Sequence, residues 1–356
     1  MIATMPININ KVQKSRIDNV DFENLQFGKI FADHMFSIDF EQQTWQNPRI
    51  EPYDKIQFEP SLLAIHYGQA IFEGMKAYRT PQNEIVTFRP LENLKRLNRS
   101  AERMCMPALS EDLFMEALQQ LISLDKDWVP SKNGSTLYIR PFMFATDELV
   151  GMNISETYRF MIITSPVGAY YAAPVKVKIE TEYLRAAKEG GVGYAKTAGN
   201  YAASMYPMKL ARQQGYDQVI WTDSRENKYL EEFGTMNIFL KINGKLLTPE
   251  TGDSVLSGIT RDSLIQLAKH MGVEVEERKI SIEEVIKAIK DNTLEEVFGA
   301  GTAAVITPIA LIGYQNTQYT LKPLDTNSLA FKLKKALTDI QTGKAEDIFQ
   351  WMHKLA

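Results

Sequence analysis

The sequence predicts a mixed α/β fold in two domains, and three observations support this. The chain has 356 residues, of which 44% are hydrophobic, so it can bury a large core and favours two domains. Strand-like and helix-like segments alternate in both halves, without internal repeats. Residues 166–174 (PVGAYYAAP) contain two prolines and a glycine without periodicity, which is typical of a connection. We expect a small α/β domain over 1–168, a linker over 169–177, a large domain over 178–356 and an active site in the interdomain cleft.

Local patterns predict individual elements in the first half. Residues 137–144 (LYIRPFMF) and 159–164 (RFMIIT) are rich in apolar and β-branched residues, which favours strands. Ser110 precedes a run with helical spacing and is a good N-cap residue. One face of that predicted helix carries Leu113, Phe114, Ala117, Leu118 and Leu121.

The second half repeats this alternation. Residues 175–179 (VKVKI) alternate as a strand does, and residues 218–221 (QVIW) form a second apolar run. Residues 238–247 predict a hairpin that turns at Asn243 and Gly244. Two helices are predicted, one from Thr260 to Met271 ended by Gly272, and one opened by the capping box at 281–284 (SIEE) and ending near Lys290.

Charge and composition argue against several functional classes. A net charge of −4 and a pI near 5.8 give no basic surface for nucleic acid or anionic lipid. No apolar run reaches the roughly 18 residues of a membrane span, and the first ten residues do not resemble a secretion signal. Cys105 is the only cysteine and the four histidines lack ligand spacing, so we expect no metal site. We therefore expect a cytoplasmic protein that acts on small molecules.

Lys196 is the best candidate for a reactive residue. It lies in residues 190–201 (GGVGYAKTAGNY), with glycines on both sides and Tyr201 five residues downstream. Glycines let the backbone approach a bound group closely, and a confined lysine can lose its proton and attack a carbonyl. Most lysines are solvated surface charges, so the rest of the chain must support this interpretation.

A phosphate-binding P-loop is one alternative for this segment, because Gly190 is followed at the right distance by Lys196 and Thr197. That loop requires a hydrophobic strand before its first glycine, but residues 182–189 (EYLRAAKE) are not strand-like. Ala195 also occupies the position where the loop requires glycine. The P-loop interpretation is therefore disfavoured.

A pyridoxal phosphate enzyme is the other interpretation, and its chemical needs have candidates here. Such an enzyme requires a lysine, an acid for the pyridine nitrogen and a phosphate site with backbone amides at a helix start. Residues 258–262 (GITRD) begin a predicted helix, and residues 299–303 (GAGTA) form a second glycine turn with a hydroxyl. Glu231 and Glu232 lie just before the strand that starts at Ile238.

Taken in order, these segments resemble the branched-chain amino acid aminotransferases, pyridoxal phosphate-dependent enzymes of fold type IV. The resemblance runs from residues 27–34 (FGKIFADH) to the end of the last helix. Its further landmarks are FEGMKA at 72–77, FRP at 88–90, RLNRSA at 96–101, DKDWVP at 125–130, LYIRP at 137–141, PVGAY at 166–170, KTAGNY at 196–201, GTMN at 234–237, GITR at 258–261 and GTA at 301–303. The resemblance implies a homodimer or a higher homo-oligomer and transfer of an amino group between L-leucine, L-isoleucine or L-valine and 2-oxoglutarate.

The resemblance also implies roles for the cofactor-binding residues. Lys196 is expected to carry the cofactor as an internal aldimine and to move the proton during transamination. Glu232 is expected to pair with the pyridine nitrogen, with Glu231 as the uninvolved neighbour, and Tyr201 to donate to the 3-oxygen. Four groups are expected to hold the phosphate, namely Arg96, the amides of Ile259 and Thr260, and the hydroxyl of Thr302.

The same resemblance implies a substrate pocket that accepts both an apolar side chain and the γ-carboxylate of glutamate. The expected aromatic walls are Phe27, Tyr67, Phe72, Tyr138 and Tyr170. Arg140 is expected to bind the γ-carboxylate, and Thr235 with the amides of Thr302 and Ala303 the α-carboxylate. The period of two in a strand also places Tyr138 and Arg140 on one face, and an inward arginine needs an anionic partner.

The sequence departs from the pattern of this family in two places, and it leaves two alternative functions open. Ala304 and Thr307 occupy the positions of a redox cysteine pair found in some animal members, so this chain lacks that pair. Met152, in a loop at 149–152 expected to reach a partner subunit's pocket, replaces a smaller residue and leaves the preference among the three substrates open. The reaction direction is also open.

A D-amino acid aminotransferase or aminodeoxychorismate lyase shares the cofactor residues, and a non-catalytic metabolite-binding protein would keep the pocket without the lysine.

Overall fold

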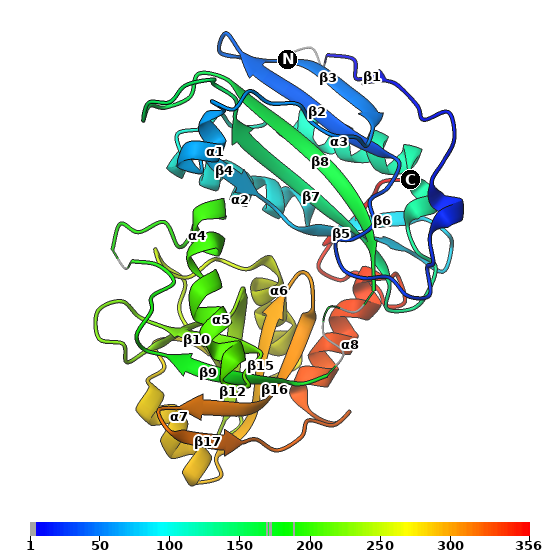
Figure 1. Cartoon of the computed structure of the whole chain (residues 1–356). Coiled ribbons are helices and arrows are strands. Elements are labelled where there is room, and N and C mark those ends of the chain that lie inside the picture. Colours follow the sequence, from blue (N-terminus) through cyan, green and yellow to red (C-terminus); the bar gives the residue numbers. More distant parts are fainter. Residues whose placement is uncertain (1–4, 169, 171–172, 188) are drawn as a thin grey trace. The chain divides into compact units, whose positions relative to one another are not determined.

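The structure is a computed structural model that describes residues 5–168, 170, 173–187 and 189–356 (Figure 1). The chain forms two compact units. The first unit comprises Met1–Tyr170, Ala195–Ala198 and Ile340–Ala356, and the second comprises Tyr171–Tyr194 and Gly199–Asp339. Among the described residues, no helix is long and apolar enough to cross a membrane.

These units do not contain the same residues as the expected domains. Lys196, expected in the second domain, lies with the first unit, as do the last residues of the chain from Ile340 onward. Residues 169, 171 and 172 of the expected linker lie outside the described residues, and its last three residues belong to strand β9 (Val175–Glu180). The division at 168 and 178 stays a prediction.

The first unit is built on a mostly antiparallel sheet in the order β1-β3-β2-β8-β7-β5-β6-β18, with β4 paired to β7. Helices α2 and α3 pack on one face of this sheet (Figure 1). The elements are β1 (Asn8–Ile9), η1 (Ile17–Asn19), β2 (His34–Glu41), β3 (Thr44–Pro52), α1 (Leu63–Tyr67), β4 (Ala70–Phe72), β5 (Met75–Arg79), β6 (Ile85–Phe88), α2 (Pro90–Arg103), α3 (Glu111–Leu124), η2 (Lys126–Trp128), β7 (Thr136–Ala145), β8 (Tyr158–Val167) and β18 (Met352–Lys354).

Alternation along the central strand β7 separates the core from the side that carries the candidate site. Leu137, Ile139 and Met143 point into the core shared with α2 and α3. Tyr138 and Arg140 therefore lie on the opposite face of the sheet, because successive side chains of a strand alternate. The predicted strands at 137–144 and 159–164 are confirmed, and so is the helix capped by Ser110, whose Oγ accepts the Leu113 amide hydrogen.

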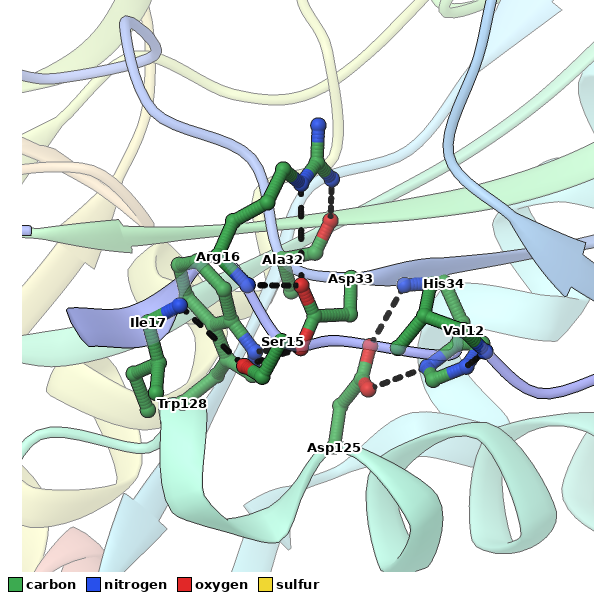
Figure 2. Close-up of polar contacts among 9 residues, drawn as sticks. All are labelled: Val12, Ser15, Arg16, Ile17, Ala32, Asp33, His34, Asp125 and Trp128. Carbon is green, nitrogen blue, oxygen red and sulfur yellow. Dashed lines mark hydrogen bonds and ion pairs between the residues drawn. The ribbon is translucent and has the colours of Figure 1, made fainter. Parts of the chain in front are cut away.

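Buried polar groups fix the N-terminal segment to β2 (Figure 2). The carboxylate of Asp33 accepts the amide hydrogen of Arg16 at 2.9 Å. His34 Nε2 accepts the amide hydrogen of Val12 at 3.0 Å, and Nδ1 lies 2.6 Å from Asp125 Oδ1. Since Nε2 accepts, the imidazole proton belongs on Nδ1, facing Asp125. Asp33 also accepts hydrogen bonds from Ser15 Oγ and Trp128 Nε1, and it forms an ion pair with Arg16 Nε at 3.6 Å.

The second unit contains a mixed sheet in the order β11-β10-β9-β16-β15-β12-β13-β14, with β17 paired to β16 and β11 also paired to β12. Val219 and Trp221 of β10 pack with Ala211 of α5, whereas Ile220 packs in the cluster that contains α7. Helices α5 and α7 therefore cover opposite faces of this sheet. The elements are β9 (Val175–Glu180), α4 (Ala198–Ala203), α5 (Met205–Gln213), β10 (Gln218–Thr222), β11 (Leu230–Phe233), β12 (Met236–Ile242), β13 (Lys245–Thr248), α6 (Ile259–His270), β14 (Val275–Glu277), α7 (Ile282–Lys290), β15 (Leu294–Gly301), β16 (Val305–Tyr314), β17 (Thr317–Thr320) and α8 (Leu329–Gln341).

Most local predictions for the second unit are confirmed. Ile242 pairs with Lys245 across a turn in which Asn243 and Gly244 have φ of 50° and 79°, as a tight hairpin requires. Strands at 175–179 and 218–221 are present, as are the two predicted helices, within one residue. In the capping box, Ser281 Oγ accepts the amide hydrogen of Glu284.

The predicted glycine turn at 299–303 is wrong in part. Gly299 and Gly301 lie in strand β15 and pair with β16, and the turn begins only at Thr302. A Cβ on Gly299 would lie 2.1 Å from a ring carbon of Phe233, so this glycine allows close packing rather than a turn.

Candidate active site

Lys196 is held by hydrogen bonds within the first unit. Its carbonyl accepts the amide hydrogen of Phe72 at 3.0 Å, and its own amide donates to Ser100 Oγ at 2.9 Å. Thr197 forms an isolated bridge with Ile71, so residues 195–198 extend the edge next to β4. The lysine is half-buried, and its Nζ lies 4.8 Å from the centre of the Phe72 ring. Backbone pairing thus fixes Lys196, while its side chain lies along an aromatic ring.

A row of aromatic rings continues from Lys196. The Arg140 guanidinium lies 4.7 Å from the Phe72 ring centre and 5.3 Å from that of Tyr138. Phe27 contacts Tyr138 edge-on at 4.9 Å and also contacts Tyr170, at 4.8 Å. The structure therefore brings together Lys196 and most of the predicted aromatic wall.

Arg140 is the only guanidinium in this row. Its Nη2 donates to the Tyr138 hydroxyl at 3.0 Å, which confirms that the two side chains share a face. Its Nε is buried and has no hydrogen-bond partner, and no carboxylate of the described chain pairs with it. A buried cationic donor with unused capacity fits an anionic ligand. Gly74 makes room for this pair, since a Cβ there would lie 2.3 Å from the Tyr138 hydroxyl.

Two predicted pocket residues lie outside this row. The described ring contact of Tyr67 is with His66, and its side chain is 43% exposed. Met152 is 88% exposed in the loop between β7 and β8. Among the described residues, neither side chain makes a ring contact with the aromatic row.

Arg96 is buried in α2 and bound to Glu73, which lies between β4 and β5. Arg96 Nε and Nη2 donate to the two oxygens of Glu73 at 2.7 and 2.8 Å. Burial raises the pKa of Glu73, but the charge and hydrogen bonds of Arg96, together with the charge of Lys196, lower the pKa below its usual range. Glu73 has no role among the residues predicted from the sequence, although it lies within the FEGMKA segment.

In the second unit, Glu232 is buried at the end of β11 and paired with Arg185 at 2.7 Å. Its Oε1 accepts the amide hydrogen of Leu256 at 2.8 Å and lies 3.4 Å from Asn237 Nδ2. Arg185 was missed by sequence reasoning, because it does not stand out from its local sequence, and Asn237 lies in the GTMN segment but was given no role.

The N-terminus of α6 lies beside the hydrogen bonds that hold Glu232. A Cβ on Gly258, its N-cap, would lie 2.0 Å from Asn237 Oδ1, so glycine is required where the helix start meets the Glu232 network. The amides of Ile259 and Thr260 donate to no other residue that the structure describes. Such amides at a helix N-terminus suit a phosphate. Thr302 and Thr235 lie in turns, Thr302 half-buried and Thr235 exposed, whereas Tyr201 is half-buried in α4.

The donor set fits pyridoxal 5′-phosphate. In the first unit, the Lys196 amine suits its aldehyde and the Arg96 guanidinium suits its phosphate. In the second unit, the buried Glu232 carboxylate suits its pyridine nitrogen, and the α6 amides and the Thr302 hydroxyl suit a phosphate. Among the described residues, no group of three or more possible ligands for a metal ion is found.

Comparisons with known proteins agree with this chemistry. The model of the amino-transferase class IV family matches residues 70–312. Branched-chain-amino-acid transaminase 1 of Bacillus subtilis is 49% identical over 336 residues, which are 93% of this chain and 94% of the relative. The chain belongs to the branched-chain amino acid aminotransferases of class IV. The family expected from the sequence is thus confirmed.

Other members of this family give the same result. Branched-chain-amino-acid aminotransferase 2 of Bacillus subtilis is 45% identical and covers 99% of this chain and 97% of its own length. The crystal structure of the Escherichia coli branched-chain amino acid aminotransferase matches with a TM-score of 0.74 at 29% identity, covering 91% of this chain and 99% of that one. The Thermobaculum terrenum enzyme, solved in its PLP-form, shares the fold with a TM-score of 0.74 at 21% identity, covering 91% and 98%.

Proposed function

We propose that this branched-chain aminotransferase transfers the amino group of L-leucine, L-isoleucine or L-valine to 2-oxoglutarate, reversibly, with pyridoxal 5′-phosphate as its cofactor. The observation that carries the proposal is the row from Lys196 through Phe72 to Arg140 and Tyr138. Aromatic faces suit an aliphatic side chain, and the one guanidinium among them suits the γ-carboxylate of glutamate. One pocket can therefore serve both half-reactions.

The cofactor supplies an electron-withdrawing ring that weakens the Cα–H bond of the bound amino acid. Lys196 Nζ would hold the cofactor through its aldehyde, and the same amine would be the base that moves the proton to and from the substrate Cα. Glu232, held by Arg185, keeps the pyridine nitrogen protonated. We assign the hydrogen bond to the 3-oxygen to Tyr201.

We assign phosphate binding to Arg96, the Ile259 and Thr260 amides and Thr302. Substrate contacts are assigned to the aromatic row, with Thr235 and the amides of Thr302 and Ala303 binding the α-carboxylate. Tyr67 and Met152 are assigned to the pocket only through the resemblance.

A homodimer is the assembly we propose, supported by an exposed apolar loop. Leu149, Val150, Met152 and Ile154 are between 41% and 88% exposed, and the Leu149 amide hydrogen bonds the Ser61 carbonyl at 2.9 Å. Four such side chains on one loop are typical of a protein interface.

Met152→Glu should weaken association in sedimentation, whereas Ile348→Glu, at another exposed apolar position, should not. Equal sedimentation of the two variants would contradict this assignment. The cytoplasmic location stays a prediction.

Amino-donor assays test the proposed reaction. Purified protein should show a visible absorption band that borohydride abolishes, and it should transaminate L-leucine, L-isoleucine and L-valine with 2-oxoglutarate. Activity with D-alanine instead of L-leucine would favour a D-amino acid aminotransferase. A protein that binds these metabolites without the visible band would be non-catalytic.

A further inference from the structure

Glu73 is a buried carboxylate whose oxygens are fully engaged by α2 and by its own loop. It has no exposed surface, and it binds Arg96 through two nearly parallel hydrogen bonds of 2.7 and 2.8 Å. Asn93 Nδ2 donates to the same Oε2 at 2.8 Å, and the Gly74 amide lies 3.2 Å from it. Such a bidentate pair fixes the plane of a guanidinium as well as its position.

The Glu73 backbone is fixed independently of Arg96. Its amide donates to the Pro141 carbonyl at 2.7 Å, which ties it to β7 beside Arg140. The preceding residue, Phe72, donates its amide hydrogen to the Lys196 carbonyl. Glu73 is therefore a rigid reference point for Arg96 that is also linked to the lysine.

Stability alone gives little reason for this pair. Replacing a buried ion pair by apolar residues of similar volume is often neutral or stabilising, because the desolvation of both charges is costly. What a buried pair does provide is a fixed orientation. The two hydrogen bonds hold the Nε–Nη2 edge of the guanidinium, so the direction of its remaining edge follows from the geometry of Glu73.

We propose that Glu73 is a positioning residue that orients Arg96 toward the phosphate of the cofactor. This inference rests on the proposed function, in which Arg96 binds that phosphate. Glu73 itself touches neither substrate nor cofactor. Its effect should therefore appear in the binding of the phosphate group and not in the binding of the pyridine ring.

The test compares pyridoxal 5′-phosphate with pyridoxal, both titrated into the full chain after cofactor removal and followed by the visible band. Both aldehydes link to Lys196, so the dissociation constant of pyridoxal divided by that of pyridoxal 5′-phosphate isolates the contribution of the phosphate. Glu73→Gln keeps the shape but turns an amide NH2 toward Arg96. We expect it to weaken pyridoxal phosphate binding roughly 10- to 100-fold, the range for loss of one charge-assisted hydrogen bond, with pyridoxal binding unchanged.

Four further variants complete the test. Arg96→Ala should reduce the ratio, and Glu73→Gln in the Arg96→Ala background should reduce it no further. Asp39→Asn is the control, because Asp39 is likewise a carboxylate paired with arginine, here Arg49 and Arg159, but it belongs to strand β2 and has no bond to Arg96. Glu73→Asp keeps the charge on a side chain that is one methylene shorter, so it should draw Arg96 back and also reduce the ratio. It keeps the test available if Glu73→Gln fails to fold.

The outcomes separate the inference from the proposed function. If Arg96→Ala lowers the ratio but both Glu73 variants keep the wild-type ratio, Glu73 does not position Arg96. Equal losses for pyridoxal phosphate and pyridoxal in the Glu73 variants would also overturn the inference, because they would show a purely structural role. If Arg96→Ala itself leaves the ratio unchanged, the assignment of Arg96 to the phosphate fails first.

Discussion

Arg140→Leu should separate the two half-reactions of the enzyme. In the structure, Arg140 donates one hydrogen bond to Tyr138, its Nε has no partner, and no described carboxylate neutralises it. The γ-carboxylate of glutamate would be its natural counter-charge, whereas leucine offers no charge to lose. The variant should therefore impair the reaction of glutamate and 2-oxoglutarate far more than that of leucine.

The magnitude follows from the loss of one buried charge-assisted partner. That loss costs about 2 to 5 kcal/mol, or roughly 30- to several-thousand-fold in kcat/KM for glutamate. For leucine we expect a change below about tenfold, or 1.4 kcal/mol, since the new side chain lies among the same aromatic rings. Arg140→Lys should recover part of the loss, because it restores the charge without the planar fork.

Stopped-flow absorbance measures each half-reaction separately, from the conversion between the aldehyde and amine forms of the cofactor. Arg159→Leu is the matched control, a partly buried arginine on the neighbouring strand β8 that pairs with Asp39. It should affect both substrates equally. Equal losses for glutamate and leucine in Arg140→Leu would refute the reasoning and assign Arg140 to the α-carboxylate or to the pocket wall.

Three further predictions follow from the same structure. Lys196→Ala should abolish transamination in steady-state assays while circular dichroism shows an intact fold, and comparable turnover would exclude the assignment. Glu232→Gln should lower kcat roughly 100- to 1000-fold with cofactor still bound, and a larger effect of Glu231→Gln would show that the wrong glutamate is assigned. Asp33→Asn should lower the free energy of unfolding by about 1 to 3 kcal/mol in urea titrations at pH 7, because the amide cannot accept all three hydrogen bonds. Burial raises the pKa of Asp33, but the hydrogen bonds from Ser15, Arg16 and Trp128 together lower it by more, so the pKa in the folded state lies below the usual value. The stabilisation from Asp33 is therefore fully present above the unfolded pKa near 4 and is lost as the pH falls through the folded pKa. The free energy of unfolding of Asp33→Asn should not show this loss at low pH. A variant whose stability depends on acid pH as the wild type does would contradict the role of Asp33.

The sequence predicted those features that depend on short-range patterns. The hairpin at Asn243 and Gly244, the cap at Ser110 and the shared face of Tyr138 and Arg140 all follow from local spacing. The proposed roles of Lys196 and Glu232 depend on the ordered motifs, since a lysine beside glycines is weak evidence alone.

Long-range contacts could not be predicted in this way. Lys196 joins the first unit through backbone bonds to Phe72 and Ser100, residues more than ninety positions away, and periodicity carries no information about such pairs. The same holds for Glu73 with Arg96 and for Arg185 with Glu232, where each partner alone is an ordinary charged residue. Gly299 was misassigned to a turn because glycine also serves close packing, here against Phe233.

Peptide mapping after borohydride reduction tests the central claim most directly. Reduction of the purified protein should fix the cofactor to one lysine, and mass spectrometry of a digest should show the added mass on the peptide that contains Lys196. Prior addition of L-leucine should prevent the labelling, since the cofactor then leaves the lysine as the amine form, and 2-oxoglutarate should restore it. A label on another lysine, or labelling that L-leucine does not prevent, would contradict the account.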